Sequence, residues 1–118
     1  MPGLDPGIHV FVAIRHFACS KYRMSGGWVY ILTNRPIGTL YVGVTHDLVH
    51  RVWEHREGVA DGFTKRYALK RLVYFEHHDD MRGAIQREKN VKHWSRAWKV
   101  RLILRDNPDW EDLYDRIA

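Results

Sequence analysis

Two short apolar segments joined by a tight turn are the feature that most limits how this chain can fold. Residues 28–32 read WVYIL and residues 39–44 read TLYVGV, and both are rich in the β-branched and aromatic residues that favour strands. Between them, residues 34–38 (NRPIG) are of the types that favour turns. Strands joined by so short a connection pair as an antiparallel hairpin. We therefore expect a sheet that begins with this hairpin.

The sequence after the hairpin predicts a helix, a loop and a third strand. Residues 45–47 offer N-capping side chains, and the helix that follows ends at Gly58. Its expected apolar stripe consists of Leu48, Val49, Val52 and Trp53. Residues 59–70 are polar and basic and are expected to form a loop, whereas residues 71–76 (RLVYFE) predict a third strand that joins the hairpin in one sheet.

Two further helices complete the predicted order. Asp79 and Asp80 can cap a helix across residues 80–93, and a third helix is expected over residues 95–105. Asn107 and the proline after it stop that helix, and the following DWEDLYDRI adds a last helical turn or two. The order β-β-α-β-α-α predicts a small α+β domain, in which a three-stranded antiparallel sheet is flanked by helices.

Residues 1–25 differ from the rest of the chain and are expected to lie outside the domain, which then spans residues 26–118. The segment lacks a sustained period of strand or helix, and Met24 stands just before the patterned sequence. An arm or a start placed too far upstream explains this, and the alternative is an extra element packed on the core. The interrupted apolar stretch at residues 8–18 follows Asp5 and has no basic segment before it, so it does not resemble a secretion signal.

Cysteine content and hydropathy favour a cytoplasmic protein without a membrane association. Cys19 is the single cysteine, so an internal disulfide is impossible. No apolar run is long enough to cross a bilayer. We therefore expect a cytoplasmic location, and the sequence does not indicate any protein partner.

The distribution of charge predicts a polyanionic partner. The net charge is +5, and residues 51–105 contain fourteen Lys or Arg against seven Asp or Glu. Residues 106–118 contain five acidic residues against one arginine. A basic body with a short acidic end is typical of a protein that binds nucleic acid, although an ordinary solvated surface explains the same counts.

Glu88 is the residue that fits its surroundings least. On the helix predicted for residues 80–93 it falls in the middle of an apolar stripe formed by Met81, Ala84, Ile85 and Val91. An isolated buried carboxylate is costly, so it needs a compensating cation. One alternative is a salt bridge to a buried Arg or Lys. The other is a hard metal ion such as Mg²⁺, which often uses one or two carboxylates plus water and phosphate oxygens.

Four more residues could carry chemistry beside Glu88. Arg51 and His55 are four residues apart on one helix and project to the same side; an arginine can grip a phosphate and a histidine can move a proton. Tyr30 and Tyr41 stand one on each strand of the hairpin, where a tyrosine near a metal and an arginine can be drawn towards its phenolate. The ordinary explanations are a solvated helix flank and strand-favouring tyrosines.

A glycine within the second strand points to the same region. Gly43 lies two residues after Tyr41, and a glycine inside a strand weakens the strand. Its presence predicts that something approaches the backbone closely at this position, and substrate is one candidate.

Together these residues resemble the motif set of the GIY-YIG nucleases. The resemblance rests on Tyr30 in WVYIL, on Tyr41 and Gly43 in LYVGV, on Arg51-x3-His55 and on Glu88 in AIQREK. The first motif reads Trp-Val-Tyr where the family has Gly-Ile-Tyr, and the second has valine for isoleucine. The stretches FTKRYALKRLVYFE, REKNVKHW and NPDW resemble the short, single-domain bacterial members. The resemblance covers about residues 27–115.

The resemblance implies a metal-dependent DNA endonuclease, with DNA repair as a natural setting. Glu88 would hold one divalent ion, Mg²⁺ or Mn²⁺, and Arg51 would stabilise charge on the phosphate being cleaved. One of the two tyrosines, which one being open, would help to activate the attacking water, and His55 would orient or relay the proton. An asparagine closes the site in several members, and here Asn107 matches better than Asn90.

Substrate contacts and the choice of substrate are less sharply defined. Thr64, Lys65 and Arg66 lie in the predicted loop and can reach the backbone of a nucleic acid, and Gly43 and Asn107 are further candidates for substrate binding. The sequence shows no recognition helix and no zinc-finger spacing, which favours selection of DNA by structure. Two other functions are compatible with the residues: a non-catalytic nucleic-acid-binding module of the same fold, and a protein that acts on RNA.

Overall fold

A three-stranded antiparallel sheet lies at the centre of the computed structural model, which describes residues 26–59 and 62–118. Strand β1 (Gly27–Thr33) is the middle strand, between β2 (Leu40–Thr45) and β3 (Arg71–His78). The predicted hairpin and its third strand are therefore confirmed. All seven residues of β1 are buried, while β2 forms one edge of the sheet.

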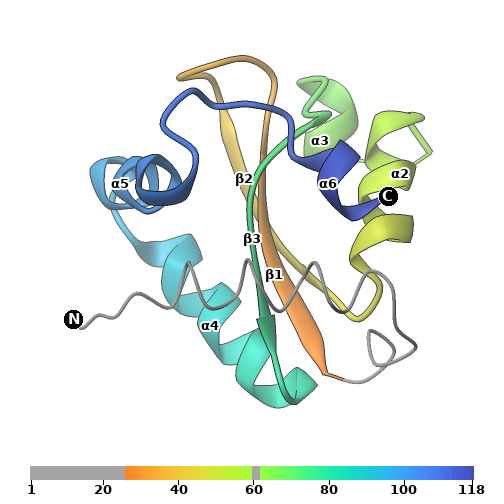
Figure 1. The fold of residues 1–118 in the computed structure, drawn as a ribbon, viewed down its shortest axis with the longest axis vertical. Coiled ribbons are helices and arrows are strands. Elements are labelled where there is room, and N and C mark those ends of the chain that lie inside the picture. Colours follow the sequence, from red (N-terminus) through yellow and green to blue (C-terminus); the bar gives the residue numbers. More distant parts are fainter. Residues whose placement is uncertain (1–25, 60–61) are drawn as a thin grey trace.

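Helices cover both faces of the sheet (Figure 1). On one face lie α2 (Leu48–Arg56), the short α3 (Phe63–Arg66) and α6 (Tyr114–Ile117). On the other face lie α4 (Met81–His93) and α5 (Arg96–Asp106). The alternation of side chains along β1 explains this arrangement, since residues with period 2 face opposite sides. Trp28, Tyr30 and Leu32 pack in the α2 cluster, and Val29 and Ile31 pack in the α4–α5 cluster.

A bulge in β3 adjusts this alternation. Ile31 pairs with Tyr74 and Leu32 pairs with Leu72, so Val73 is left without a partner in the register with β1. As a result both Val73 and Tyr74 belong to the cluster beneath α4 and α5, whereas Leu72 belongs to the opposite cluster.

The helix boundaries follow the predicted capping chemistry. The carboxylate of Asp47 accepts a hydrogen bond from the backbone N–H of His50, and Asp80 accepts one from Gly83. Gly58 has a φ of 74°, a conformation that suits glycine at the end of a helix. The expected loop at residues 59–70 was wrong in part, because residues 63–66 form α3.

The predicted apolar stripes were too wide. Helix α2 buries Leu48, Val52 and His55, and α4 buries Ala84, Glu88 and Val91, in each case with a spacing of four and then three residues. Trp53 and Ile85, which were expected in these stripes, are 43% and 38% exposed. Each follows a buried residue by one position, which turns it about 100° away from the sheet.

Two further expectations concern the domain boundary near residue 26 and the absence of a membrane-spanning segment. The boundary proposed near residue 26 depends on residues 1–25, which lie outside the described residues. Among the residues that are described, no helix has the length and hydropathy needed to cross a membrane.

Candidate nuclease site

A chain of buried polar side chains connects the sheet to α2 and α3. The Tyr30 hydroxyl on β1 lies 3.2 Å from Nε2 of His55 on α2, and Nδ1 of His55 lies 3.0 Å from Oγ1 of Thr64 on α3. His55 and Thr64 are 4% and 5% exposed. Both ring nitrogens of the imidazole therefore have a protein partner, which fixes its orientation.

Tyr41 on β2 packs against the same pair of rings. Its ring centroid is 6.3 Å from that of Tyr30 and 5.7 Å from that of His55. Tyr30 is 1% exposed, whereas Tyr41 is only partly buried. The two tyrosines of the hairpin therefore lie together as expected, but only Tyr41 has contact with solvent.

Gly43 makes this arrangement possible. A Cβ atom at this position would lie 2.5 Å from both Cζ and the hydroxyl oxygen of Tyr30, and 2.9 Å from Cε2 of Tyr41. Because Tyr30 is the register partner of Gly43, its phenol ring lies across the glycine. The close approach predicted from the sequence is thus made by the protein's own tyrosine, so Gly43 needs no contact with substrate to explain its presence.

Arg51 reaches the same cluster from α2. Its Nη1 donates to Oε1 of Glu54 at 2.9 Å, one turn along the helix. Burial opposes the charge of Arg51, but hydrogen bonds to Glu54 and Tyr30 outweigh that cost, and the pKa of its guanidinium is raised. Its side chain is 38% exposed. Arg51 therefore presents a charged group at the surface of the site.

The electrostatics of the cluster hold both Tyr30 and His55 in their neutral forms. Burial raises the pKa of the Tyr30 hydroxyl above its ordinary 10.0, and Tyr41 and Glu88 add to this, while Arg51 opposes it. Burial, followed by the charge of Arg51, lowers the pKa of His55 from 6.5 to about 4. The expectation that Tyr30 is drawn towards its phenolate is not met in the protein alone, because the buried hydroxyl is desolvated.

Glu88 lies on α4 with 7% of its surface exposed, as the helical pattern predicted. Its charge is close enough to Tyr30 to raise the pKa of that hydroxyl. Its compensating cation is Lys92, whose Nζ lies 2.7 Å from Oε2 of Glu88. The salt bridge weighed in the sequence was to a buried cation, whereas the Lys92 side chain is 53% exposed. The lysine can therefore leave the carboxylate and enter water.

One carboxylate of this environment, Glu88, could hold a divalent ion. Within the described residues, no group of three or more His, Cys, Asp or Glu side chains could hold a metal. Mg²⁺ is commonly bound through one or two carboxylates, with water and substrate phosphates completing its shell. A buried carboxylate that already has a cation beside it, and whose lysine partner is free to move, matches that chemistry. Glu88 is the residue that would hold the ion.

The remaining candidates divide into two groups. Lys65 and Arg66 are exposed on α3, next to Thr64, and so lie on the segment that supports His55. Asn107 is elsewhere: its Nδ2 donates to the carbonyls of Val73 and Glu111, and its Oδ1 accepts from the Glu111 N–H. These bonds satisfy the carbonyl at the β3 bulge, so the Asn107 amide has a structural use.

The runner-up, Asn90, is exposed on α4 and accepts a hydrogen bond from Gln86. Both asparagines thus make their hydrogen bonds to residues outside the Tyr30–His55 cluster.

Three supporting contacts were missed in the sequence. Two of them, Glu54 with Arg51 and Lys92 with Glu88, follow helical spacings of three and four residues and could have been found from those spacings. The third, Thr64 with His55, joins residues nine apart on two different helices. Thr64 was expected to reach substrate, and nothing in the local pattern indicated that it would hold the imidazole.

Comparison with known proteins identifies the family. The model of the GIY-YIG catalytic domain matches residues 26–101, well over half of the chain. The chain belongs to the GIY-YIG family. The members of this family are nucleases. The match covers both hairpin tyrosines, Arg51, His55 and Glu88.

Individual relatives within the family are small proteins. A UPF0213 protein of Syntrophus aciditrophicus is 38% identical over 87 residues, which are 73% of this chain and 98% of that protein. A UPF0213 protein of Natronomonas pharaonis is 38% identical over 76 residues, covering 64% of this chain and 88% of the relative. The solution NMR structure of a UPF0213 protein from Bacillus halodurans is 30% identical, with a TM-score of 0.47, covering 74% of this chain and 92% of the other.

Proposed function

We propose that this GIY-YIG protein is a divalent-metal-dependent endonuclease that hydrolyses phosphodiester bonds in DNA. The observation that carries the proposal is the convergence of Tyr41, His55 and Arg51 on Tyr30, within electrostatic reach of the buried Glu88. Such a set combines groups that move a proton with groups that hold negative charge, and hydrolysis of a phosphodiester needs both.

Tyr41 is the tyrosine best placed to contact the attacking water, because Tyr30 is buried and neutral. The rings of Tyr30 and His55 pack against Tyr41, and the hydrogen bond between them holds both rings in place. With its pKa of about 4, His55 is neutral at physiological pH, and its Nε2 can accept a hydrogen bond from the Tyr30 hydroxyl. Thr64 holds the other ring nitrogen, which keeps the imidazole in the orientation that serves Tyr30.

Arg51 and Glu88 serve the phosphate. The exposed side of the Arg51 guanidinium can donate to non-bridging phosphate oxygens while Glu54 holds its other side. A divalent ion bound through Glu88 would supply positive charge to the phosphate and to the leaving oxygen. Lys65 and Arg66, on the helix after the site, would contact the DNA backbone without reading its sequence.

Selection by DNA structure accompanies this proposal. Among the described residues, the helices and strands form one unit, the sheet with its helices, and no separate domain accompanies it. The site would therefore choose among substrates by the shape and accessibility of the strand, as in nicks, flaps and branches. A panel of linear, nicked, flapped and branched DNA, together with RNA of matched sequence, tests this choice in the presence of Mg²⁺ or Mn²⁺ and with chelator.

Replacement of Glu88 separates an enzyme from a binding module. We expect Glu88→Gln and Glu88→Ala to abolish cleavage, while Glu88→Gln keeps most of the DNA affinity at low salt. Since Lys92 is half exposed, loss of its partner should change the free energy of unfolding by no more than about 1 kcal/mol. The control is Glu111→Gln, an exposed carboxylate paired with Arg116, which should cut DNA normally.

Three outcomes would contradict the proposal. If the Glu88 variants cleaved at the normal rate, the carboxylate would not be part of the site. If the native protein bound the panel without cutting any member, it would be a binding module of the same fold. If RNA alone were cut, the substrate class would be wrong.

A further inference from the structure

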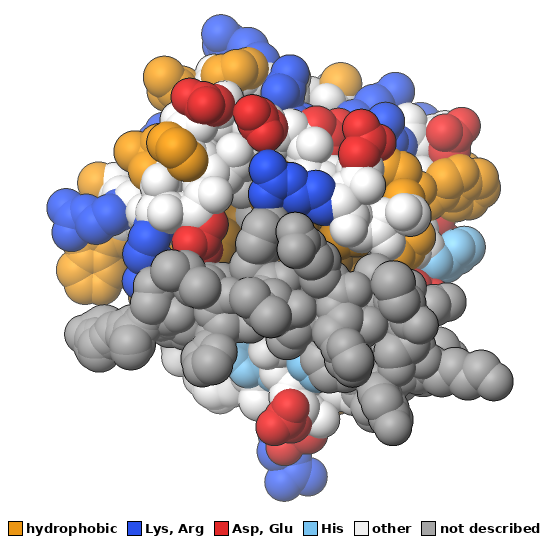
Figure 2. All heavy atoms as spheres, viewed as in Figure 1, with side chains coloured by type: hydrophobic (Ala, Val, Ile, Leu, Met, Phe, Trp, Pro, Cys, Tyr) orange, Lys and Arg blue, Asp and Glu red, His pale blue; other side chains and the backbone are white. Residues whose placement is uncertain are grey.

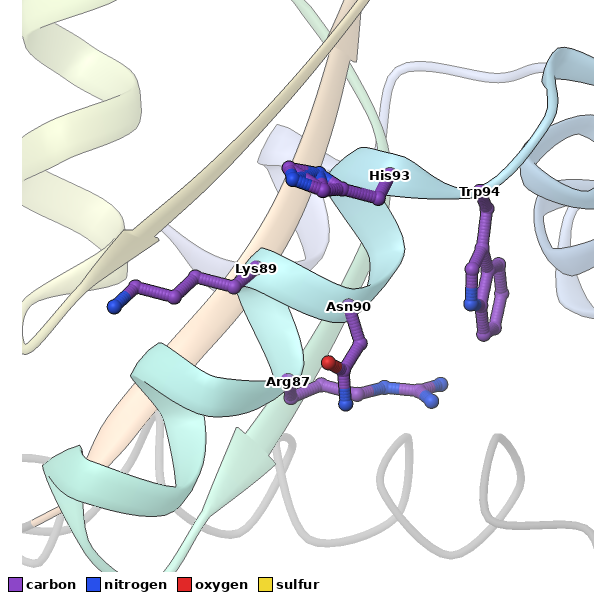
Figure 3. A pocket seen from close by; sticks show the side chains of 5 residues that line it. All are labelled: Arg87, Lys89, Asn90, His93 and Trp94. Carbon is purple, nitrogen blue, oxygen red and sulfur yellow. The ribbon is translucent and has the colours of Figure 1, made fainter.

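The face of the molecule formed by α4 and α5 carries an exposed tryptophan, Trp98, and a partly buried one, Trp94, beside arginines. Trp98 on α5 is 55% exposed, and its ring meets that of Trp94 edge-to-face, with 5.7 Å between the centroids. Arg87 on α4 lies over the ring of Trp94 at 5.1 Å. In Figure 3 Arg87 and Trp94 point to the same side of α4, whereas Lys89 points the other way. A large aromatic ring left in solvent on one face calls for an explanation.

These residues line a cavity of about 930 Å³ along the outer side of α5. The residues that line it include Trp94, Trp98, Leu104, Arg101 and Arg105. Trp98, Arg101 and Arg105 are three and four residues apart, so they follow one face of the helix. We call Trp94, Trp98, Arg101, Leu104 and Arg105 together the α5 platform. Hydrophobic and basic side chains stand next to each other over α5 at the left of Figure 2.

The charges of the platform are available to a ligand. Arg87 is already engaged, because its guanidinium donates to the buried carboxylate of Glu76 at 2.9 and 3.3 Å. In the part of the chain that the structure describes, neither Arg101 nor Arg105 forms an ion pair, and both are exposed. The described residues that line the cavity include no carboxylate. The platform therefore combines an aromatic face with uncompensated positive charge.

We propose that the α5 platform binds an unpaired stretch of nucleic acid. Trp98 stacks on a base, and Arg101 and Arg105 contact successive phosphates from positions about 6 Å apart along the helix. Stacking on an aromatic ring needs an unstacked base, which a single strand offers and a regular duplex does not. The platform lies on the sheet face opposite to α2 and His55, so it is a second binding surface, separate from the candidate nuclease site.

Charge disfavours two other possible occupants of the platform, the chain's own residues 1–25 and a second copy of the chain. Residues 1–25 of this chain contain one acidic side chain, Asp5, against three basic ones, so the arginines of the platform would repel them. A second copy of the chain carries a net charge of +5 and would be repelled in the same way. A polyanion with exposed aromatic faces satisfies both properties of the platform.

Binding of a short fluorescent oligothymidylate to the full chain, with chelator present to prevent cleavage, tests the proposal. We expect Trp98→Ala to weaken binding about tenfold and Trp98→Tyr to restore most of it. The matched control is Trp53→Ala, which removes an exposed tryptophan from α2 and should change affinity less than about twofold. Circular dichroism establishes that each variant is folded.

The arginines are tested by reversal of charge. We expect Arg101→Glu with Arg105→Glu to weaken binding more strongly than Arg82→Glu with Arg35→Glu, two exposed arginines outside the platform. The variant at the platform should also lower the dependence of affinity on salt concentration. A duplex of the same sequence should compete poorly for the platform.

Several results would overturn the proposal. If Trp98→Ala and Trp53→Ala lost the same affinity for the oligothymidylate, the platform would not bind unpaired strands. The same would follow if a duplex competed as well as the single strand does. Contacts between the Trp98 ring and residues 1–25 in nuclear magnetic resonance spectra would make the chain's own segment the occupant. If sedimentation showed a dimer of the native protein and Trp98→Ala dissociated it, the occupant of the platform would be a second copy of the chain. Because every readout is binding, loss of cleavage in the proposed nuclease site would not affect the result.

Discussion

At the level of single residues, burial decides the chemical state of the site. Tyr30 and His55 are both titratable, yet the removal of water from each of them keeps both neutral. Each is then held by hydrogen bonds, Tyr30 to His55 and His55 to Thr64. In the resting protein this pair is therefore uncharged. The charged groups of the site, Arg51 and Glu88, stand at its margins.

The lowered pKa of His55 predicts a particular loss of stability in acid. Its pKa is about 4 in the folded protein and about 6.5 in an unfolded chain. Between these values the unfolded chain binds a proton that the folded protein refuses, so the free energy of unfolding falls as the pH falls. The contribution is fully present above pH 6.5. Between about pH 7.5 and pH 5 it should decrease by about 2 kcal/mol.

Urea unfolding of the native protein and of His55→Gln at the two pH values measures this contribution. The variant should lose less stability between about pH 7.5 and pH 5 than the native protein, by about 2 kcal/mol. The control is His50→Gln, since His50 lies on the same helix with its side chain 61% exposed. Equal losses in the native protein and in His55→Gln would show that His55 is protonated in the folded state near its ordinary pKa.

At the level of helices and strands, the hairpin and α2 form the site together. Strand β2 supplies Tyr41 and the space above Gly43, β1 supplies Tyr30, and α2 adds Arg51 and His55. The narrow buried face of α2 ends in His55, so the last position of its stripe is polar. Helix α3, short as it is, contributes the hydroxyl that holds the imidazole. Each element thus places one or two groups, and no single element contains the site.

Substitution of Gly43 tests how closely these elements fit. In Gly43→Ala the new Cβ would lie 2.5 Å from the Tyr30 ring, which is buried and cannot move aside freely. We expect the free energy of unfolding to decrease by about 1–3 kcal/mol and cleavage to be lost as Tyr30 shifts. The control Gly83→Ala, whose Cβ would meet only the Asp80 side chain at 3.0 Å, should change stability by less than about 1 kcal/mol. Normal stability and cleavage in Gly43→Ala would contradict the fit.

Across the molecule as a whole, the two faces of the sheet carry different groups of side chains. One face, under α2, α3 and α6, contains the Tyr30–His55–Thr64 chain. The other face, under α4 and α5, contains the α5 platform and the buried Tyr74–Glu76–Arg87 contacts. Glu88 is on α4 but acts on Tyr30, because α4 also contacts β2 and β1 near the edge of the sheet.

Removal of residues 1–23 tests the predicted domain boundary. A shortened chain that begins at Met24 retains the strands and helices from Gly27 to Ile117. We expect its melting temperature in thermal unfolding to equal that of the full chain. A decrease of more than a few degrees, which corresponds to about 1 kcal/mol for a domain of this size, would show that the removed segment packs on the core.

Local patterns in the sequence were enough to predict the three strands, most of the helices and most of their ends, while α3 was missed. Short runs of β-branched and aromatic residues predicted the strands. Asp47, Asp80 and Gly58 predicted helix ends, because capping depends on neighbouring residues alone. The burial of Glu88 also followed from helical periodicity. These features share a cause: each depends on residues within one or two turns of each other, whose relative positions the local backbone fixes.

How distant residues meet became visible only in the folded chain. The Thr64–His55 contact, the phenol ring of Tyr30 over Gly43 and the Asn107 amide at the β3 bulge all join separate elements. Widths of the apolar stripes were misjudged because the sheet covers only part of each helix. The pKa shifts of Tyr30 and His55 also belong here. They arise from the exclusion of water by packing, a property of the assembled core that no local pattern contains.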